Sequence, residues 1–270
     1  MKIHNQAMVA FSVTRYQKNE KLMEKSMNKL SSGLAIRQAS DNAAGLAVAE
    51  TMRAQVRGLS QAQRNMQDGL SVLQAANEGL NNVNALLQRG RELAVMNANE
   101  TMTATDREAS QEELNQLMEA INDTASKLEF NTKKILGENA PLLLMVGANP
   151  GQQISIDLMD TSTKALNLEG ISLLTQKDAG ELISRLDQAI QQTTGNLTKI
   201  GSYQEAIEHH MTNTLVNESN LTSSLSMVAD TDMAKEIASN LSLTIRQNSD
   251  KIIVSHVNQS VSEVLGLFSR

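Results

Sequence analysis

The sequence predicts a mainly α protein in which two long helical arms flank a small β-hairpin insert. Apolar residues recur at every third or fourth position along most of the 270 residues, which is the spacing of one face of an α-helix. Aromatic residues make up only 2% of the chain, which favours long helices packed along narrow seams over a compact core of large side chains. Both prolines, Pro141 and Pro150, lie in the middle, so the arms lack the residue that breaks helices.

The first arm begins with a helix that we expect to end at Gly33. Its apolar stripe consists of Ile3, Ala7, Ala10 or Phe11, Leu22, Met23, Met27, Leu30 and Leu34. The stretch from Leu30 to Glu50 then gathers Ser, Gly, Asp and Asn residues, all of which favour caps and turns over helix interiors. We therefore expect Gly33 to stop the first helix, and Ser40 or Asp41 to cap the next one.

A much longer helix is predicted from about Ala43 to Asn97. Its stripe consists of Leu46, Met52, Val56, Leu59, Met66, Leu70, Leu73, Leu80, Val83, Leu86, Leu87 and Leu93. At about 1.5 Å per residue this helix would be about 80 Å long, and only a partner helix could stabilise that length. A third helix is expected to start at Asp106, ahead of a stripe formed by Leu114, Leu117, Ile121 and Leu128.

The insert between the arms has the pattern of a β-hairpin. Residues 142–146 form a short apolar run, residues 147–151 contain Gly, Asn and Pro, and residues 153–158 alternate between polar and apolar side chains. Two such runs separated by turn residues predict two antiparallel strands.

The second arm repeats the helical pattern. One helix, from about Ala179 to Ser223, has its stripe at Leu182, Ile183, Leu186, Ile190, Leu197, Ile200, Ile207 and Leu215. A final helix has its stripe at Met233, Ile237, Leu241, Ile245, Ile252, Ile253, Val257, Val261, Val264, Leu265 and Phe268. Both ends of the chain are thus amphipathic helices, and they must pair with each other or with other molecules to bury their stripes.

Charge and composition exclude several classes of function. The net charge of −6 and the pI near 5.3 disfavour nucleic-acid binding, which needs Lys and Arg against phosphates. We interpret the four lysines at Lys18, Lys21, Lys25 and Lys29 as a solvated helix face in preference to a basic binding patch. No stretch is long enough for membrane insertion, and the N-terminus lacks the apolar core of a secretory signal peptide.

The sequence frames no catalytic, cofactor or metal site. It contains no Cys, no Gly-x-Ser-x-Gly motif and no glycine-rich phosphate loop. His209 and His210 are adjacent, so they point about 100° apart on a helix, and we favour exposed helix residues over a zinc site there. We therefore expect neither enzymatic activity nor a cofactor.

Long, ordered motifs occur in both arms. In the first arm they are LSSGL (30–34), DNAAGLA (41–47), MRAQVRGL (52–59), QDG (67–69), QRGRELAV (88–95) and EFN (129–131), and in the second NLT (220–222), DMAKE (232–236) and VLGLFSR (264–270). These motifs closely resemble the terminal regions of bacterial flagellin, over Met1 to about Leu136 and about Leu182 to Arg270. The short middle resembles a flagellin without the outer variable domains.

The resemblance implies a long antiparallel helical rod and terminal coiled-coil helices. Residues 1–42 and 228–270 would form the inner core tube, with a connector at 31–42, and residues 43–227 would form the rod, with a β insert at about 137–175. The implied function is a structural subunit that polymerises into the flagellar filament for swimming motility. The subunit-assembly seam would consist of Ile3, Ala7, Phe11, Met27, Leu30, Ile237, Leu241, Ile245, Ile252, Val257, Val261 and Leu265.

The resemblance also implies partners and a location. The partners would be further copies of the chain, other flagellins in a mixed filament, an export chaperone and the filament cap. The protein would be extracellular, after export through the flagellar channel without a cleaved signal peptide. Arg89, Leu93 and Glu113 resemble the surface that the innate immune receptor for flagellin reads, although the same residues could instead hold one subunit against the next.

The chain departs from the family pattern at a few positions. Leu225, Met227 and Ala229 stand where the family commonly has a Glu and two Arg, and Gly90 stands where a larger apolar residue is usual. These departures keep open a divergent paralogue in place of an ordinary filament subunit. A surface-displayed homologue that acts as a binding module, and a subunit of the junction between hook and filament, also stay open as functions.

Overall fold

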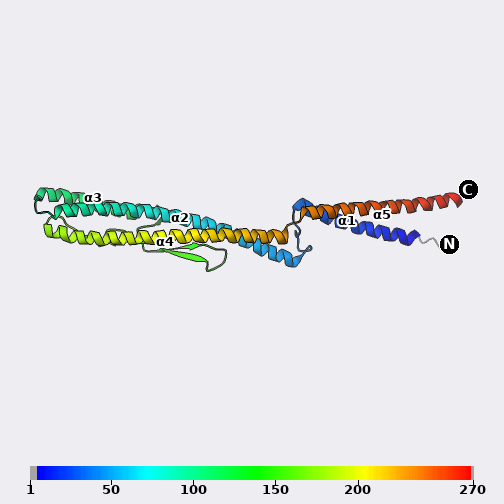
Figure 1. The fold of residues 1–270 in the computed structure, drawn as a ribbon, viewed down its shortest axis with the longest axis horizontal. Coiled ribbons are helices and arrows are strands. Elements are labelled where there is room, and N and C mark those ends of the chain that lie inside the picture. The colour runs from blue at the N-terminus through cyan, green and yellow to red at the C-terminus, as the bar shows by residue number, and fades with distance from the viewer. Residues whose placement is uncertain (1–4, 269–270) are drawn as a thin grey trace. The chain divides into compact units, whose positions relative to one another are not determined.

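The computed structural model describes the backbone of residues 5–268 and the side chains of residues 9–257 and 259. The fold is 73% helical, which confirms the mainly α prediction. The elements in chain order are α1 (Asn5–Ser32), α2 (Ala43–Asn97), α3 (Ala104–Lys127), β1 (Glu129–Phe130), β2 (Lys133–Lys134), β3 (Pro141–Met145), β4 (Gln153–Asp157), α4 (Gln176–Ala229) and α5 (Met233–Phe268) (Figure 1). Among the described residues, no helix is both long enough and apolar enough to cross a lipid bilayer.

The chain divides into two compact units. The terminal unit combines residues 1–54 with residues 220–270, and the middle unit is the continuous segment 55–219. The long helices α2 and α4 each contribute to both units.

In the middle unit, α3 and α4 both run antiparallel to α2. Arg91 of α2 pairs with Asp187 of α4 at 2.6 Å, and Gln63 donates to Glu218 at 2.6 Å, so residue numbers rise along one helix as they fall along the other. Arg89 of α2 meets Glu113 of α3 near one end, while residue 82 meets residue 124 further along. The three helices lie side by side (Figure 1). The long helix α2 therefore has the partner helices that its length demands.

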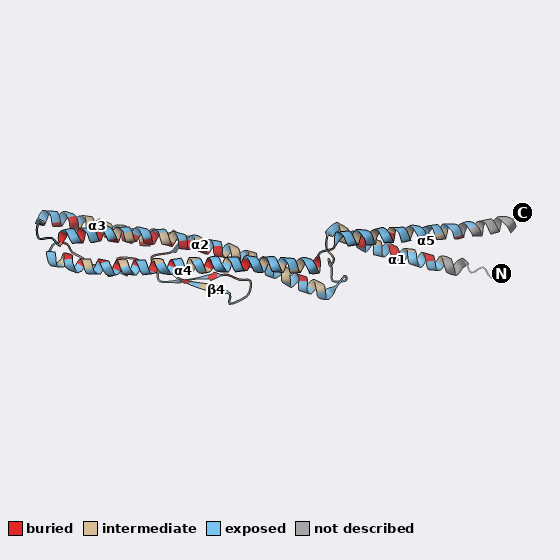
Figure 2. Ribbon diagram, in the orientation of Figure 1, coloured by how far each residue is buried: buried red, intermediate tan, exposed pale blue. Residues whose placement is uncertain are grey.

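Two apolar clusters form the core of the middle unit. One lies between α2, α3 and α4 and contains Val83, Leu87, Leu93, Ala94, Leu114, Met118, Ile121, Leu182, Leu186 and Ala189, covered by Leu166, Leu168 and Leu173 of the preceding loop. The other joins α2 and α4 to the β insert and contains Met66, Val72, Leu73, Ala76, Leu80, Ile135, Leu136, Leu144, Val146, Ile156, Ile200 and Ile207. Buried residues mark α2, α3 and α4 in this unit (Figure 2).

The predicted hairpin is present as β3 and β4. These strands pair antiparallel, with Pro141 opposite Asp157 and Met145 opposite Gln153. A second hairpin, β1 with β2, was not predicted from the sequence. Its turn places Asn131 at φ 48° and Thr132 at φ 66°, and two successive residues with positive φ are characteristic of the tight turn between hairpin strands.

The predicted cap of α2 and the predicted start of α3 were wrong. The N-cap of α2 is Asn42, whose Oδ1 accepts from the N–H of Gly45 at 2.9 Å, and not Ser40 or Asp41. The Asp41 carboxylate instead accepts from the backbone of Arg37 at 3.3 Å and closes the loop before the helix. Helix α3 begins at Ala104, because Thr103 is its N-cap and Asp106 the third residue of a capping box.

Helix α4 is longer than predicted at both ends. It begins at Gln176 and not at Ala179, since the hydroxyl of Thr175 accepts from the N–H of Asp178 at 3.1 Å and caps the first turn. It continues past Ser223 to Ala229.

Candidate assembly surfaces

Helices α1 and α5 meet along a seam made mostly of polar side chains. The described side chains of α1 that are buried are Ser12, Asn19 and Ser26, and those of α5 are Leu243, Asp250 and Val257. Each set repeats every seven residues, which is the spacing of a coiled-coil seam. The pair is antiparallel, because residue 19 contacts residue 250 whereas residue 23 contacts residue 244.

Asp250 is the charged centre of this seam. Its side chain is fully buried, and its Oδ1 lies 3.1 Å from Nη2 of Arg15. Its Oδ2 accepts from Nδ2 of Asn19 at 3.0 Å. Because a buried carboxylate without partners is costly, these contacts favour the arrangement in which the Asp250 face of α5 lies against α1.

The apolar residues of α5 lie on the opposite side of the helix. The side chains of Ile237, Leu241, Ile245 and Ile252 are between 55% and 68% exposed. At about 100° per residue they fall within an arc of about 80°, and this arc is about 180° from the buried seam residues. We call these four residues the outer face of α5. The helix thus buries Asp250 between Leu243 and Val257 in the seam, while these four large apolar side chains face solvent.

The predicted assembly residues divide between this outer face and other positions. On α1, Phe11 and Met27 are also exposed, at 63% and 55%, whereas Leu30 is half-buried. Val257 is buried in the α1–α5 seam. Ile3 lies outside the described residues, and the side chains of Ala7, Val261 and Leu265 are not among those described.

The connector after α1 is fixed to the segment between α4 and α5. Gly33 ends α1 with φ 72°, a conformation that glycine adopts without strain and that confirms the predicted stop. The N–H of Ala35 donates to the carbonyl of Ala229 at 2.7 Å, and the N–H of Thr231 donates to the carbonyl of Gly33 at 2.8 Å. These backbone bonds anchor the two ends of the chain to each other at the base of α1 and α5.

The three positions near the end of α4 that depart from the family pattern differ from one another in burial. Ala229 is buried at 2% exposure beside the connector. Met227 is 81% exposed, and Leu225 is half-buried.

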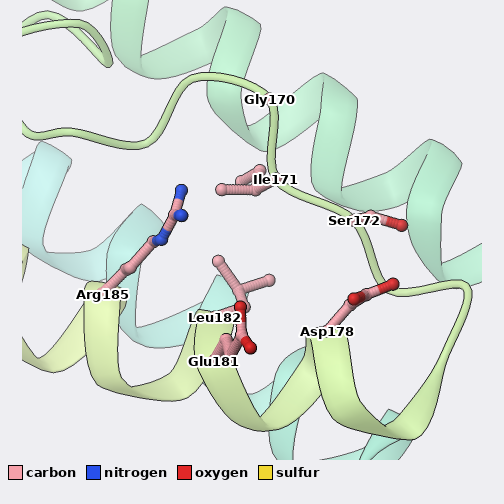
Figure 3. Close-up of a pocket in the computed structure, with 7 residues that line it drawn as sticks. All are labelled: Gly170, Ile171, Ser172, Asp178, Glu181, Leu182 and Arg185. Carbon is pink, nitrogen blue, oxygen red and sulfur yellow. The ribbon is translucent and has the colours of Figure 1, made fainter.

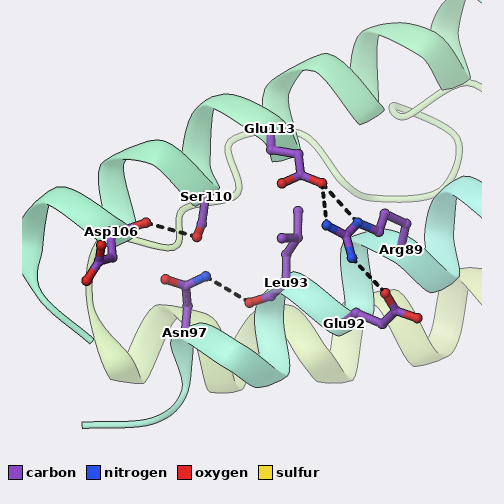
Figure 4. Close-up of polar contacts among 7 residues, drawn as sticks. All are labelled: Arg89, Glu92, Leu93, Asn97, Asp106, Ser110 and Glu113. Atoms are coloured by element: carbon purple, nitrogen blue, oxygen red, sulfur yellow. Dashed lines mark hydrogen bonds and ion pairs between the residues drawn. The ribbon is translucent and has the colours of Figure 1, made fainter. Parts of the chain in front are cut away.

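Arg89 is the centre of an ionic cluster on the middle unit. Its Nη2 lies 2.8 Å from Oε1 of Glu113 on α3, and its Nη1 lies 3.0 Å from Oε2 of Glu92 (Figure 4). Hydrogen bonds, first to Glu92 and then to Glu113, raise the pKa of Arg89 above its ordinary value. Leu93 is only 2% exposed and belongs to the core. Of the three residues expected at an immune-receptor surface, only Arg89 and Glu113 present accessible side chains.

The turn between α2 and α3 is held by an arginine that the sequence reasoning missed. Arg107 is 8% exposed; its guanidinium donates to the carbonyl of Asn97 and, at 2.9 Å, to that of Asn99. Asn97 is fully buried and donates to the carbonyl of Leu93 at 2.9 Å (Figure 4). These bonds satisfy carbonyls that the end of α2 leaves unpaired. The pair Thr103 and Asp106, spaced as a capping box, was the one local signal of this turn.

A polar cavity of about 80 Å³ lies beneath the loop that precedes α4. Figure 3 shows Arg185 reaching toward Gly170 and Ile171, with Asp178 and Glu181 on the first turns of α4. The cavity is far smaller than the 300–1,000 Å³ usual for organic ligands. Among the described residues, no group of three His, Asp or Glu side chains could hold a metal ion. His209 and Glu205 are 3.7 Å apart and both exposed.

Two family models match the chain. The model of the bacterial flagellin N-terminal helical region matches residues 3–140, and the model of the bacterial flagellin C-terminal helical region matches residues 183–268. Together they include α1, α2, α3 and α5 in full and most of α4.

Curated relatives match over most of the chain. A flagellin of Halalkalibacterium halodurans is 38% identical, over 90% of this chain and 91% of the relative. A flagellin of Bacillus subtilis is 32% identical, over 99% of both chains. The flagellar filament 33 kDa core protein of Treponema phagedenis is 35% identical, over 98% of this chain and 99% of the relative.

Solved structures resemble parts of the fold. The crystal structure of Bacillus cereus flagellin matches 56% of this chain and 88% of its own, with a TM-score of 0.52 and 29% identity. A putative flagellar hook-associated protein from Vibrio parahaemolyticus matches 70% of this chain and 99% of its own, with a TM-score of 0.60. At 13% identity, the second match shows a shared fold alone.

Proposed function

The chain belongs to the bacterial flagellin family and is a structural subunit of the extracellular flagellar filament, and we propose that its copies polymerise through the exposed apolar faces of α1 and α5. The family is structural and non-enzymatic. The observation that carries the proposal is the outer face of α5, whose four apolar side chains are more than half exposed.

The polar seam supports this assignment. Because Asn19 and Asp250 bond to each other inside the α1–α5 pair, the pair can form without burying the outer face of α5. Burial of one large apolar side chain contributes about 1.5–3 kcal/mol. Contact with a second copy would therefore stabilise the polymer through residues that the single chain leaves in water, including Ile245 and Ile252.

The substitution Ile245→Asp tests the proposal. Polymerisation would have to bury an unpaired carboxylate at every subunit contact, so the variant should stay monomeric while the middle unit remains folded. Sedimentation and electron microscopy report polymer, and circular dichroism reports the helices. Ser242→Asp is the matched control, because Ser242 is an exposed polar residue of the same helix outside the arc of the outer face. Normal filaments from Ile245→Asp would refute assembly through the outer face of α5.

The terminal segments and the middle of the chain are assigned to different parts of the filament. We assign residues 1–42 and 228–270 to an inner core tube and residues 43–227 to a rod around it. Support comes from the backbone hydrogen bonds between the connector and residues 229–231, and from the separate apolar core formed by α2, α3 and α4. Other flagellins could occupy equivalent positions in a mixed filament, because the same kind of apolar face would meet them.

Export and capping follow from the same surface. We assign to this chain export through the flagellar channel, a cytoplasmic chaperone that covers the outer face of α5 until export, and contact with the filament cap afterwards. An exposed apolar face in the cytosol promotes premature association, and a chaperone would mask it. Cells without the export apparatus should retain the protein; normal secretion from such cells would exclude this route.

Arg89 and Glu113 are candidates for recognition by the innate immune receptor for flagellin. Their side chains are 50% and 43% exposed and joined by an ion pair. Arg89→Ala should weaken receptor activation by the monomer, whereas Lys127→Ala, which removes an exposed cation from another ion pair on α3, should not. If Arg89→Ala instead impairs polymerisation alone, the cluster serves contacts between subunits.

A further inference from the structure

A small polar cavity lies where the last turns of α1 meet the connector, within the terminal unit. Its volume is about 30 Å³, and its lining includes Lys25, Lys29, Ser32, Arg37 and Asp41. A cavity of about 10–15 Å³ holds one water molecule. This site therefore has room for about two oxygen atoms, as in one carboxylate group, and not for an organic ligand.

Three cations line this cavity without an acidic partner. Within the described part of the chain, Lys25, Lys29 and Arg37 form no ion pair. The carboxylate in the lining, Asp41, accepts instead from the backbone N–H groups of Arg37 and Gln38, both at 3.3 Å. The cavity thus carries an excess of positive charge while its own carboxylate is engaged with the backbone.

The helix dipole explains only part of this charge. Lys29 lies in the last turn of α1, where a cation is favourable next to the unpaired carbonyls. Arg37 lies outside the helix, on the connector, so the dipole gives no reason for its position. A negatively charged group placed in the cavity would accept hydrogen bonds from both side chains.

We propose that this cavity receives the carboxylate of an Asp or Glu side chain from a second copy of the chain. The proposal rests on the assembly function given above, which brings copies into contact. The chain has 30 acidic and only 24 basic residues, so each copy offers carboxylates in excess. Hydrogen bonds from Lys and Arg to a carboxylate are stronger than neutral ones, and charge complementarity fixes orientation. The apolar faces alone are non-directional, and this contact would set how copies dock.

Zero-length cross-linking locates the partner carboxylate directly. Filaments assembled from a mixture of unlabelled and ¹⁵N-labelled full-length chains are treated with a carbodiimide, which joins an amine to a carboxylate that touches it. Mass spectrometry should find Lys25 or Lys29 joined to an Asp or Glu peptide of the other isotope. The same treatment of the monomer should not yield this product. Links only within one copy, or to Asp41 alone, would overturn the proposal.

Charge removal gives an independent measure. The double variant Lys29→Gln/Arg37→Gln should raise the critical concentration for polymerisation about tenfold, as expected for a lost charge-assisted contact, and should make it less sensitive to salt. Lys29→Arg/Arg37→Lys should restore it, because both charges are kept. Lys18→Gln/Lys21→Gln is the matched control, since it removes two cations from α1 outside this cavity. Equal effects of the two Gln double variants would refute a specific site.

A free oxyanion is the remaining occupant to test. Sulfate and phosphate are titrated into the monomer while the amide signals of the connector are followed. Millimolar binding that Lys29→Gln/Arg37→Gln abolishes would replace the subunit carboxylate by an inorganic anion and overturn the proposal. Failure of the wild-type chain to polymerise would instead contradict the assembly function itself.

Discussion

Gly90 shows how one residue can limit the stability of a long helix. It is buried inside α2, near the end of the helix at Asn97, and a Cβ added there would lie 3.5 Å from Cδ1 of Leu114 and 3.8 Å from Cδ2 of Leu186. These are ordinary van der Waals distances. Glycine costs about 1 kcal/mol relative to alanine inside a helix. Gly90→Ala should therefore raise the free energy of unfolding by about 1 kcal/mol in urea denaturation.

Gly69 provides the control on the same helix. A Cβ there would lie only 2.5 Å from Cδ2 of Leu144 on β3, so the helix gains the same propensity but the buried Leu144 side chain must leave its place in the core. Gly69→Ala should lower stability. If both variants change stability in the same direction, the packing around α2 differs from the one described.

Asp106 makes the start of α3 sensitive to acid. Its Oδ2 accepts from Oγ1 of Thr103 at 2.6 Å and from the Thr103 N–H at 3.3 Å. The hydrogen bond from the Thr103 side chain, and then that from its backbone, lower the pKa of Asp106 below the ordinary value of 3.8. Because the folded-state pKa is depressed, the stabilisation is complete above the unfolded-state pKa and is lost as the pH falls through the folded-state value. The stability gap between wild type and Asp106→Asn should stay constant near neutral pH and narrow as the pH falls below 3.8; a gap that does not narrow there would contradict the capping role.

Among the elements, we expect α1 and α5 to depend most on partners outside the chain. Their seam buries only two described apolar side chains, Leu243 and Val257. Isolated helices are marginal in water, and packing normally supplies their stability. Backbone amides of residues 9–32 and 233–257 should therefore exchange hydrogen rapidly in the monomer and slowly in the polymer, whereas those of α2, α3 and α4 in the middle unit should be slow in both. Equal protection of α1 and α5 in the two states would contradict this expectation.

For the whole molecule, the distribution of the core predicts which part folds alone. The two apolar clusters belong to the middle unit, and residues 43–229 contain α2 and α4 in full. A fragment of residues 43–229 should unfold cooperatively within a few degrees of the intact monomer, since it retains that core, but should form no filaments. Circular dichroism and sedimentation measure the two properties. A fragment that is largely unfolded would mean that the termini stabilise the middle unit.

The sequence by itself determined the kind and approximate extent of the main elements. The prediction of a helix from Ala43 to Asn97 was confirmed, as were the stop at Gly33 and the hairpin of residues 141–157. These features arise from local causes: the period of apolar residues, the conformational freedom of glycine and the turn residues between strands. The family membership was readable for the same reason, because its motifs are continuous stretches of sequence.

Only the tertiary structure decided which residue caps α2 and which face of α5 packs against α1. Three adjacent residues could each have capped α2, and the choice of Asn42 depends on Asp41 bonding backward to close the loop. The apolar period of α5 gave no sign that Asp250 is buried in the seam while the outer face of α5 stays exposed. That choice rests on Asn19 and Asp250, which are 231 residues apart in sequence. A pairing between distant residues leaves no periodic trace in either helix, because periodicity records which residues share a face and not which neighbour that face meets.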